Sequence, residues 1–82
     1  MKTITWTEQA QADVRRLDMP TTMRILRALH RFAQSGVGDI RALKGGHEEL
    51  RLRIGDYRVF FVHAGDDAIE IRRVRHRSQA YR

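Results

Sequence analysis

Hydrophobic residues in the first half of the chain recur every three or four positions, which is the spacing of one face of a helix. Two such groups occur, Ala10, Val14 and Leu17, followed by Ile25, Leu29 and Phe32. The first group predicts a helix over residues 8–17, with Thr7 as its N-cap. The second group predicts a helix that begins at Pro20 or Thr21 and ends at Ser35.

In the second half of the chain the period changes to an alternation of hydrophobic and polar residues. Together with a β-branched segment near the start, this alternation predicts strands over residues 3–6, 49–54, 57–63 and 68–75 and a short extended piece at residues 40–43. Gly55 and Asp56 have the composition of a two-residue hairpin turn. Val74 falls out of phase in the last strand, and a β-bulge near Arg72 and Arg73 would restore the phase.

The resulting order of elements, a strand, two helices and an antiparallel meander, is typical of an α+β fold. We expect a single domain over residues 1–82, in which an N-terminal strand and a two-helix hairpin accompany a small curved antiparallel sheet and the helices pack on one face of it. Hydrophobic residues make up 41% of the chain, which is enough for a packed core. The other face of the sheet is then open for function.

A two-residue turn at Gly55 and Asp56 determines which residues of the flanking strands face each other. It places Arg53 opposite Arg58, and Arg51 opposite Phe60, on the open face. Like charges in such positions destabilise a sheet by about 0.2–1 kcal/mol per pair, so stability does not explain them. The alternative is that these arginines only keep the face soluble, but lysine and glutamate would do that equally well. We therefore expect this face to bind a polyanion.

The charge of the whole chain also favours a nucleic-acid partner. Sixteen Lys and Arg residues oppose ten Asp and Glu residues, giving a formal net charge of +6, and only Lys2 and Lys44 are lysines. The rigid guanidinium fork matches phosphate well. We find no apolar run able to span a membrane and no signal-peptide pattern, so we expect a cytoplasmic protein without membrane contact. No metal-ligand spacing and no phosphate-binding glycine motif occurs, so we expect neither a metal nor another cofactor.

The end of the chain adds further cations and two groups that can take part in phosphoryl transfer. Residues 72–82 contain five arginines, a histidine and a tyrosine. His76 can transfer protons near neutral pH, and Tyr81 can donate a proton or stack on a base. Each alone is more simply a surface or packing residue. Together, beside a basic sheet face, they form a candidate phosphoryl-transfer site.

Several segments of the chain resemble the RelE/ParE superfamily of toxin–antitoxin toxins. They comprise residues 6–17, 43–45, 50–59 and 74–82, and the most specific parts are the hairpin sequence RIGDYRV and the ending HRSQAYR. The resemblance implies a RelE-like fold and the toxin of a type II toxin–antitoxin system. It further implies an mRNA interferase, a metal-independent endoribonuclease that cuts mRNA in the ribosomal A site. In that reaction the ribose 2′-hydroxyl attacks the adjacent phosphate and leaves a 2′,3′-cyclic phosphate and a 5′-hydroxyl.

The resemblance also implies roles for individual residues. Arg51 and Arg53 match basic strand positions, and Arg58 matches an arginine that contacts phosphate. Arg77 matches a C-terminal arginine that stabilises the transition state, and Tyr81 matches a tyrosine that stacks on or positions the RNA. The other cations near these positions and one aromatic residue are expected to bind RNA, namely Lys44, Phe60, Arg73, Arg75 and Arg82.

The general base is an open point of this candidate site. RelE has lysines where this chain has Arg51 and Arg53, and an arginine stays protonated and makes a poor base. We take His76 as the best candidate for the base and count it among the catalytic residues, with Glu48 or Glu49 as the next choice.

Two other functions stay open. One is a ParE-like toxin that inhibits DNA gyrase without nuclease activity, and the other is a plain nucleic-acid-binding module or a toxin that has lost its activity. The histidine, arginine and tyrosine of the ending favour the nuclease, because a gyrase inhibitor has no need of them. The expected partners are mRNA, the ribosome and a cognate antitoxin, with a toxin–antitoxin heterotetramer as one assembly to consider. An acidic, partly disordered antitoxin that folds on binding would suit the basic surface.

Overall fold

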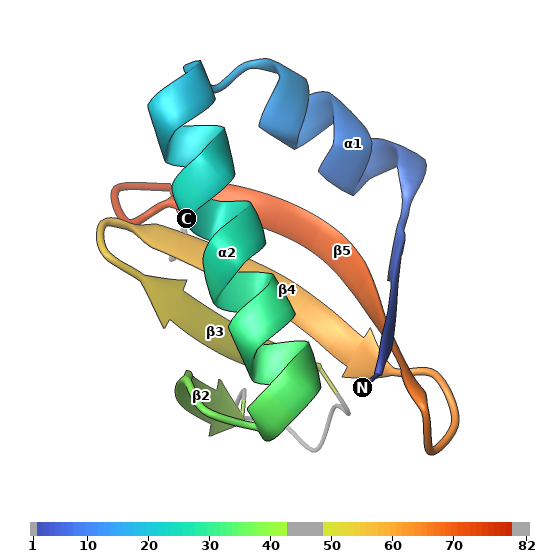
Figure 1. Cartoon of the computed structure of the whole chain (residues 1–82). Coiled ribbons are helices and arrows are strands. Elements are labelled where there is room, and N and C mark those ends of the chain that lie inside the picture. The colour runs from blue at the N-terminus through green and yellow to red at the C-terminus, as the bar shows by residue number, and fades with distance from the viewer. Residues whose placement is uncertain (1, 43–48, 80–82) are drawn as a thin grey trace.

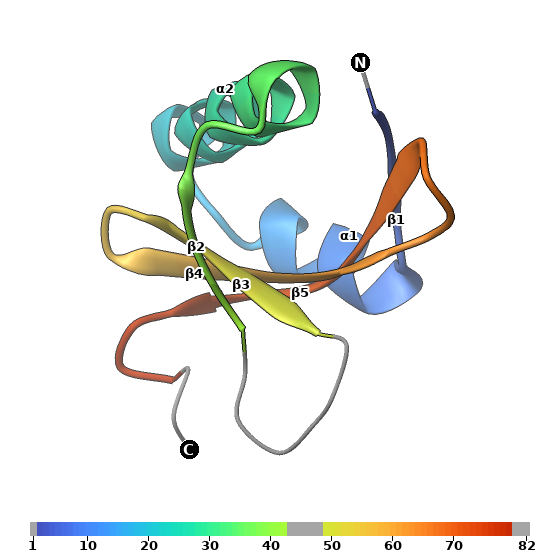
Figure 2. The same ribbon diagram turned by 90° about the horizontal axis from the view of Figure 1, so that it is seen from below.

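The computed structural model describes residues 2–42 and 49–79, which form two helices and five strands in the expected order (Figure 1). The elements are β1 (Thr3–Trp6), α1 (Glu8–Arg15), α2 (Met19–Ser35), β2 (Asp39–Ala42), β3 (Leu50–Ile54), β4 (Tyr57–His63) and β5 (Ala68–His76). Both helices lie on the concave side of a curved sheet (Figure 2). The α+β architecture expected from the sequence is therefore confirmed.

The strands form one sheet in the order β1-β5-β4-β3-β2. Strands β2 to β5 form the antiparallel meander that the alternation predicts. The expectation of a wholly antiparallel sheet is wrong at one edge, because β1 pairs with β5 in parallel. The two helices carry the chain from β1 across to the far edge, and three reversals then bring β5 back in the same direction as β1.

The predicted pairing of β3 with β4 is confirmed. The paired residues are Ile54 and Tyr57, Arg53 and Arg58, Leu52 and Val59, and Arg51 and Phe60. The predicted bulge is confirmed as well. Phe60 pairs with Arg73 but Phe61 pairs with Ile71, which leaves Arg72 as the extra residue of β5. Because of this extra residue, Ile71 and Val74 can both point into the core.

Helix α1 is capped by Thr7 as predicted, and it ends two residues earlier than expected. Helix α2 begins at Met19, slightly before the predicted start, because Asp18 caps it. The Asp18 carboxylate accepts hydrogen bonds from the Thr21 hydroxyl at 2.7 Å and the Thr21 amide at 3.1 Å, and these bonds lower the pKa of Asp18. Pro20 fits the first turn, where its missing amide is not needed. Within the described part of the chain, neither helix is long and apolar enough to cross a membrane.

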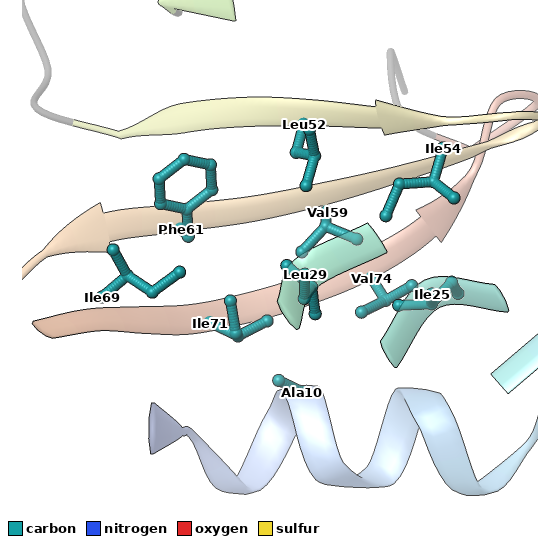
Figure 3. Close-up of a cluster of buried hydrophobic side chains, with 10 residues drawn as sticks. All are labelled: Ala10, Ile25, Leu29, Leu52, Ile54, Val59, Phe61, Ile69, Ile71 and Val74. Atoms are coloured by element: carbon teal, nitrogen blue, oxygen red, sulfur yellow. The ribbon is translucent and has the colours of Figure 1, made fainter. Parts of the chain in front are cut away.

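The core lies between the concave side of the sheet and the two helices (Figure 3). Its buried members come from five elements and are Ala10, Ile25, Leu29, Leu52, Ile54, Val59, Phe61, Ile69, Ile71 and Val74. In Figure 1, α1 and α2 diverge from the turn that joins them, with α1 beside β5 and α2 crossing the sheet. The apolar side chains of this core therefore face the helices. The arginines that alternate with them in β3 face the other side of the sheet.

Truncating Leu29 should destabilise the protein far more than truncating Leu26 on the same helix. Leu29 is fully buried, whereas the Leu26 side chain is 38% exposed. We expect Leu29→Ala to lower the free energy of unfolding by about 2–5 kcal/mol, because it leaves a cavity under α2. Leu26→Ala should cost less than about 1 kcal/mol. Urea denaturation followed by circular dichroism measures both, and equal losses would contradict the placement of α2.

Candidate functional site

A hollow on the open face of the sheet, with a volume of about 220 Å³, is lined almost entirely by arginines. We call it the arginine pocket, and its lining residues are Asp39, Arg41, Arg51, Arg53 and Arg58. They come from the three neighbouring strands β2, β3 and β4. The prediction that the three arginines of the β3–β4 hairpin share one face is therefore confirmed.

Strand pairing brings these guanidinium groups together two by two. Arg53 lies opposite Arg58 across β3 and β4, and Arg41 lies opposite Arg51 across β2 and β3. Arg58 is held further, since its Nη1 donates to two backbone carbonyl oxygens at the β3–β4 turn, at 3.0 and 3.1 Å. The pocket thus has an anchored guanidinium group, that of Arg58, and two exposed ones, those of Arg41 and Arg53.

One carboxylate enters the arginine pocket from the edge strand. The Asp39 oxygens lie 3.9 Å from Nε of Arg41 and 3.9 Å from Nη1 of Arg53. Both distances are longer than a hydrogen bond, so the two arginines keep donors that can turn towards a ligand. The side chains of Arg41 and Arg53 are 71% and 60% exposed, which allows that movement.

Sequence reasoning missed Asp39 and Arg41. The signal was present, because both residues alternate with Ile40 along the extended piece predicted nearby. Pairing that piece with the following strand would have placed them on the arginine face. The sequence between this piece and the following strand carries no turn signal that sets their pairing, so the alternation alone did not identify their partners.

The prediction that Phe60 binds RNA is contradicted by its burial. Phe60 is on the expected face, but its side chain is only 2% exposed. The Arg73 guanidinium carbon lies 4.2 Å from the centre of the ring and covers it. Arg73 is itself fixed by Glu49, whose carboxylate lies 3.1 Å away. Covering the ring removes apolar surface from water, and the cation gains from the face of the ring.

The last part of β5 lies next to a different pocket, which we call the polar groove. It has a volume of about 440 Å³, lies between α1 and the end of β5, and is lined by Arg75, His76 and Tyr57 among others. The His76 ring meets the Tyr57 ring edge-on at 5.3 Å, and its Nδ1 lies 2.9 Å from the Ser78 hydroxyl. His76 therefore does not line the arginine pocket.

Arg75 lies opposite Arg58 in the pairing of β4 with β5, but it does not line the arginine pocket. Its guanidinium group forms an ion pair with Asp13 of α1, and the same carboxylate accepts the Val74 amide at 2.9 Å. The pairing of β1 with β5 ends at Ile71, so this part of β5 is an edge that Asp13 can reach. The candidate site predicted from the sequence is therefore divided, because Arg75 and His76 line the polar groove and not the arginine pocket.

Arg77 lies at the turn between β3 and β4. Its amide donates to the Asp56 carbonyl at 2.6 Å, and its Nε lies 3.9 Å from the Asp56 carboxylate. Arg58 of the arginine pocket is the second residue after this turn along the chain. Four further residues singled out in the sequence lie outside the described residues, namely Lys44, Glu48, Tyr81 and Arg82.

The open face of the sheet thus presents a cluster of cations, with a single carboxylate among the described residues that line the arginine pocket. Such a cluster can bind a phosphodiester and stabilise negative charge that develops on it. Within residues 2–42 and 49–79, no three His, Cys, Asp or Glu side chains come together in a way that could hold a metal ion.

Comparison with known proteins identifies the family. The family model for the ParE toxin of type II toxin–antitoxin systems, parDE, matches residues 4–81. The chain belongs to this family, and the predicted membership of the RelE/ParE superfamily is confirmed. No curated protein matches the chain significantly.

Solved structures of toxin–antitoxin complexes share the fold. A chain of the RelB–RelE antitoxin–toxin complex from Methanococcus jannaschii is 27% identical, with a TM-score of 0.76 and 94% of each chain covered. A chain of the RelE–RelB complex from Pyrococcus horikoshii is 24% identical, with a TM-score of 0.76, covering 96% of this chain and 98% of that one. A chain of the RelBE2 complex from Mycobacterium tuberculosis is 19% identical, with a TM-score of 0.79 and coverage of 92% and 96%. The RelE-like fold is therefore confirmed.

Removing the Asp13 carboxylate should loosen the contact between α1 and β5. Asp13→Ala leaves the Val74 amide and the Arg75 guanidinium without their shared acceptor, and the Asp13 side chain is only 9% exposed. We expect the free energy of unfolding to fall by about 2–3 kcal/mol. Asp66→Ala, in the exposed β4–β5 turn, serves as the control and should change it by less than about 0.5 kcal/mol. Urea denaturation that finds the two variants equally stable would exclude this role for Asp13.

Proposed function

We propose that this toxin is a metal-independent endoribonuclease that cuts mRNA in the ribosomal A site. The observation that carries the proposal is the arginine pocket, in which four guanidinium groups from three strands surround a space of about 220 Å³. A sheet built only for stability would not place like charges opposite each other in two successive strand pairs. A bound phosphodiester offsets that repulsion.

The pocket suits the chemistry of RNA cleavage by the neighbouring 2′-hydroxyl. During in-line attack, negative charge builds up on the non-bridging oxygens of the phosphate. Guanidinium groups fixed in advance stabilise that charge better than solvent does, because they need little rearrangement during the reaction. Arg58 suits this task best, since two backbone carbonyl groups already hold it in place. Arg51 and Arg53 would hold the flanking phosphates.

The end of the chain adds to this site in the proposal. Arg77 lies at the β3–β4 turn, next to Asp56 and close along the chain to Arg58, so it can reach a phosphate bound near that turn. Tyr81 would stack on or position the RNA, as the family resemblance implies. His76 and Arg75 line the polar groove instead, so they are more suitable for contacting RNA beside the scissile phosphate than for acting on it.

The proposal includes an antitoxin as the partner that restrains the toxin. The similar structures come from complexes of RelE with RelB and from the toxin–antitoxin complex RelBE2. This supports a cognate antitoxin for this chain. A net charge of +6 favours an acidic partner, because opposite charges speed association. An antitoxin that covers the arginine pocket would block RNA binding directly. The toxin would act in the cytoplasm, where translated mRNA is found.

The second candidate function is inhibition of DNA gyrase without nuclease activity. The observations that favour it are the ParE description of the matching family and the separation of His76 from the arginine pocket. Primer-extension mapping in induced cells distinguishes the two functions. Discrete cuts within translated codons support the nuclease, whereas DNA double-strand breaks with intact messages support gyrase inhibition.

Arg58→Ala and Arg77→Ala should each abolish growth arrest while the protein stays folded. Removing one preorganised donor commonly slows such a reaction by about 10²–10³-fold, which is enough to spare the mRNA pool. Arg15→Ala is the matched control, since Arg15 is exposed at the end of α1 on the helical side of the sheet. Growth curves after induction measure the effect, and circular dichroism checks the fold. If both pocket and turn variants stay as toxic as Arg15→Ala, the site is assigned wrongly.

A further inference from the structure

We infer that Asp39 is the general base that takes the proton from the attacking 2′-hydroxyl. The inference rests on the proposed nuclease function and names a residue for the step that sequence reasoning left open. Among the residues that the structure describes, Asp39 is the one carboxylate that lines the arginine pocket. If the arginines bind the scissile phosphate, the 2′-hydroxyl of the adjoining ribose would lie close to the Asp39 side chain.

The position of Asp39 within the pocket supports this role. It lies directly opposite Arg53 in the pairing of β2 with β3, two residues before Arg41 on the same face of β2. A nucleotide whose phosphate is held by Arg53 and Arg58 would extend its ribose along the strand pair towards Asp39. Proton transfer needs an acceptor within about 3 Å of the hydroxyl, and a side chain on the wall of the same pocket can meet that requirement.

The contacts of Asp39 also leave its carboxylate able to accept a proton. Its oxygens are 3.9 Å from both neighbouring guanidinium groups, so neither arginine engages it in a short hydrogen bond. Its side chain is 47% exposed, so a substrate can approach it. The two flanking cations also attract the phosphate. The base and the phosphate-binding groups are thus assembled by the same pair of strands.

The other candidates among the described residues fit less well, and Glu48 lies outside those residues. Glu49 is engaged by Arg73 at 3.1 Å, and its side chain is only 20% exposed. His76 lies in the polar groove, where it contacts Tyr57 and Ser78. The arginines stay protonated and cannot accept a proton at neutral pH.

In the proposed step, the 2′-oxygen forms a bond to phosphorus while its proton passes to the Asp39 carboxylate. The bond between phosphorus and the 5′-oxygen of the next nucleotide breaks, and the electron pair leaves with that oxygen. Solvent water protonates the departing 5′-oxygen, and the neutral Asp39 then returns its proton to solvent. The products are a 2′,3′-cyclic phosphate and a 5′-hydroxyl, and no other reactant is needed.

The test compares Asp39→Asn with wild-type protein in single-turnover cleavage of mRNA on programmed ribosomes. Asparagine keeps the size of the side chain but cannot take the proton, so we expect cleavage to slow by about 10²-fold or more. Binding of the same RNA, measured with a 2′-deoxy substitution at the scissile position, should be unchanged or tighter, because a negative charge is lost from the pocket. Asp66→Asn makes the same change in net charge at an exposed turn and should leave both measurements unchanged.

Asp39→Glu gives a readout that a purely structural residue would not move. Glutamate keeps a carboxylate on the wall of the arginine pocket, so we expect Asp39→Glu to recover part of the cleavage that Asp39→Asn loses.

The possible results separate the two proposals. If wild-type protein cleaves and Asp39→Asn cleaves within threefold of it, Asp39 is not the base. If Asp39→Asn loses RNA binding or its fold together with cleavage, Asp39 has a structural role and the inference is overturned. If wild-type protein itself leaves ribosome-bound mRNA intact, the nuclease function fails and the inference falls with it.

Discussion

The pairing of β3 with β4 is the constraint on which the rest of the structure depends. The turn at Gly55 and Asp56 sets it, and Gly55 has a φ of 59°, a left-handed conformation that favours glycine. With this register, Leu52 and Val59 enter the core while Arg53 and Arg58 face outward. A slip by one residue would exchange the two sets. The same turn therefore determines both the stability of the fold and the composition of the arginine pocket.

The fold tolerates a dense cluster of cations because acidic side chains are placed at its margins. Asp39 stands between two arginines at the edge strand, Glu49 holds Arg73 over the ring of Phe60, and Asp13 holds Arg75. Each of these carboxylates neutralises part of the charge without filling the arginine pocket. The arginines that line the pocket come from β2, β3 and β4, whereas Arg73 and Arg75 of β5 take part in structural contacts.

The parts of the structure that sequence could predict are those with local causes. The alternation around the β3–β4 turn predicts the register, and the phase change at Val74 predicts a bulge near Arg72 and Arg73, which the structure has at Arg72. The parts that could not be predicted depend on contacts far apart along the chain. Nothing near Arg75 indicates that Asp13 will bind it, and nothing near Phe60 indicates that Arg73 will cover it. Asp39 lines the pocket because β2 pairs with β3, and no turn signal in the sequence predicts the register of that pairing.

The central claim is that the arginine pocket is where this toxin binds the ribose–phosphate backbone of RNA. The most direct test is to follow the side-chain Nε–Hε signals of the arginines by NMR while a short RNA with a 2′-deoxy scissile position is added. The signals of Arg41, Arg51, Arg53 and Arg58 should shift together and saturate at the same RNA concentration, while that of Arg15 on α1 stays in place. Arg16 and Arg75 both line the polar groove. If only their signals shift and those of the arginine pocket do not, the claim is contradicted.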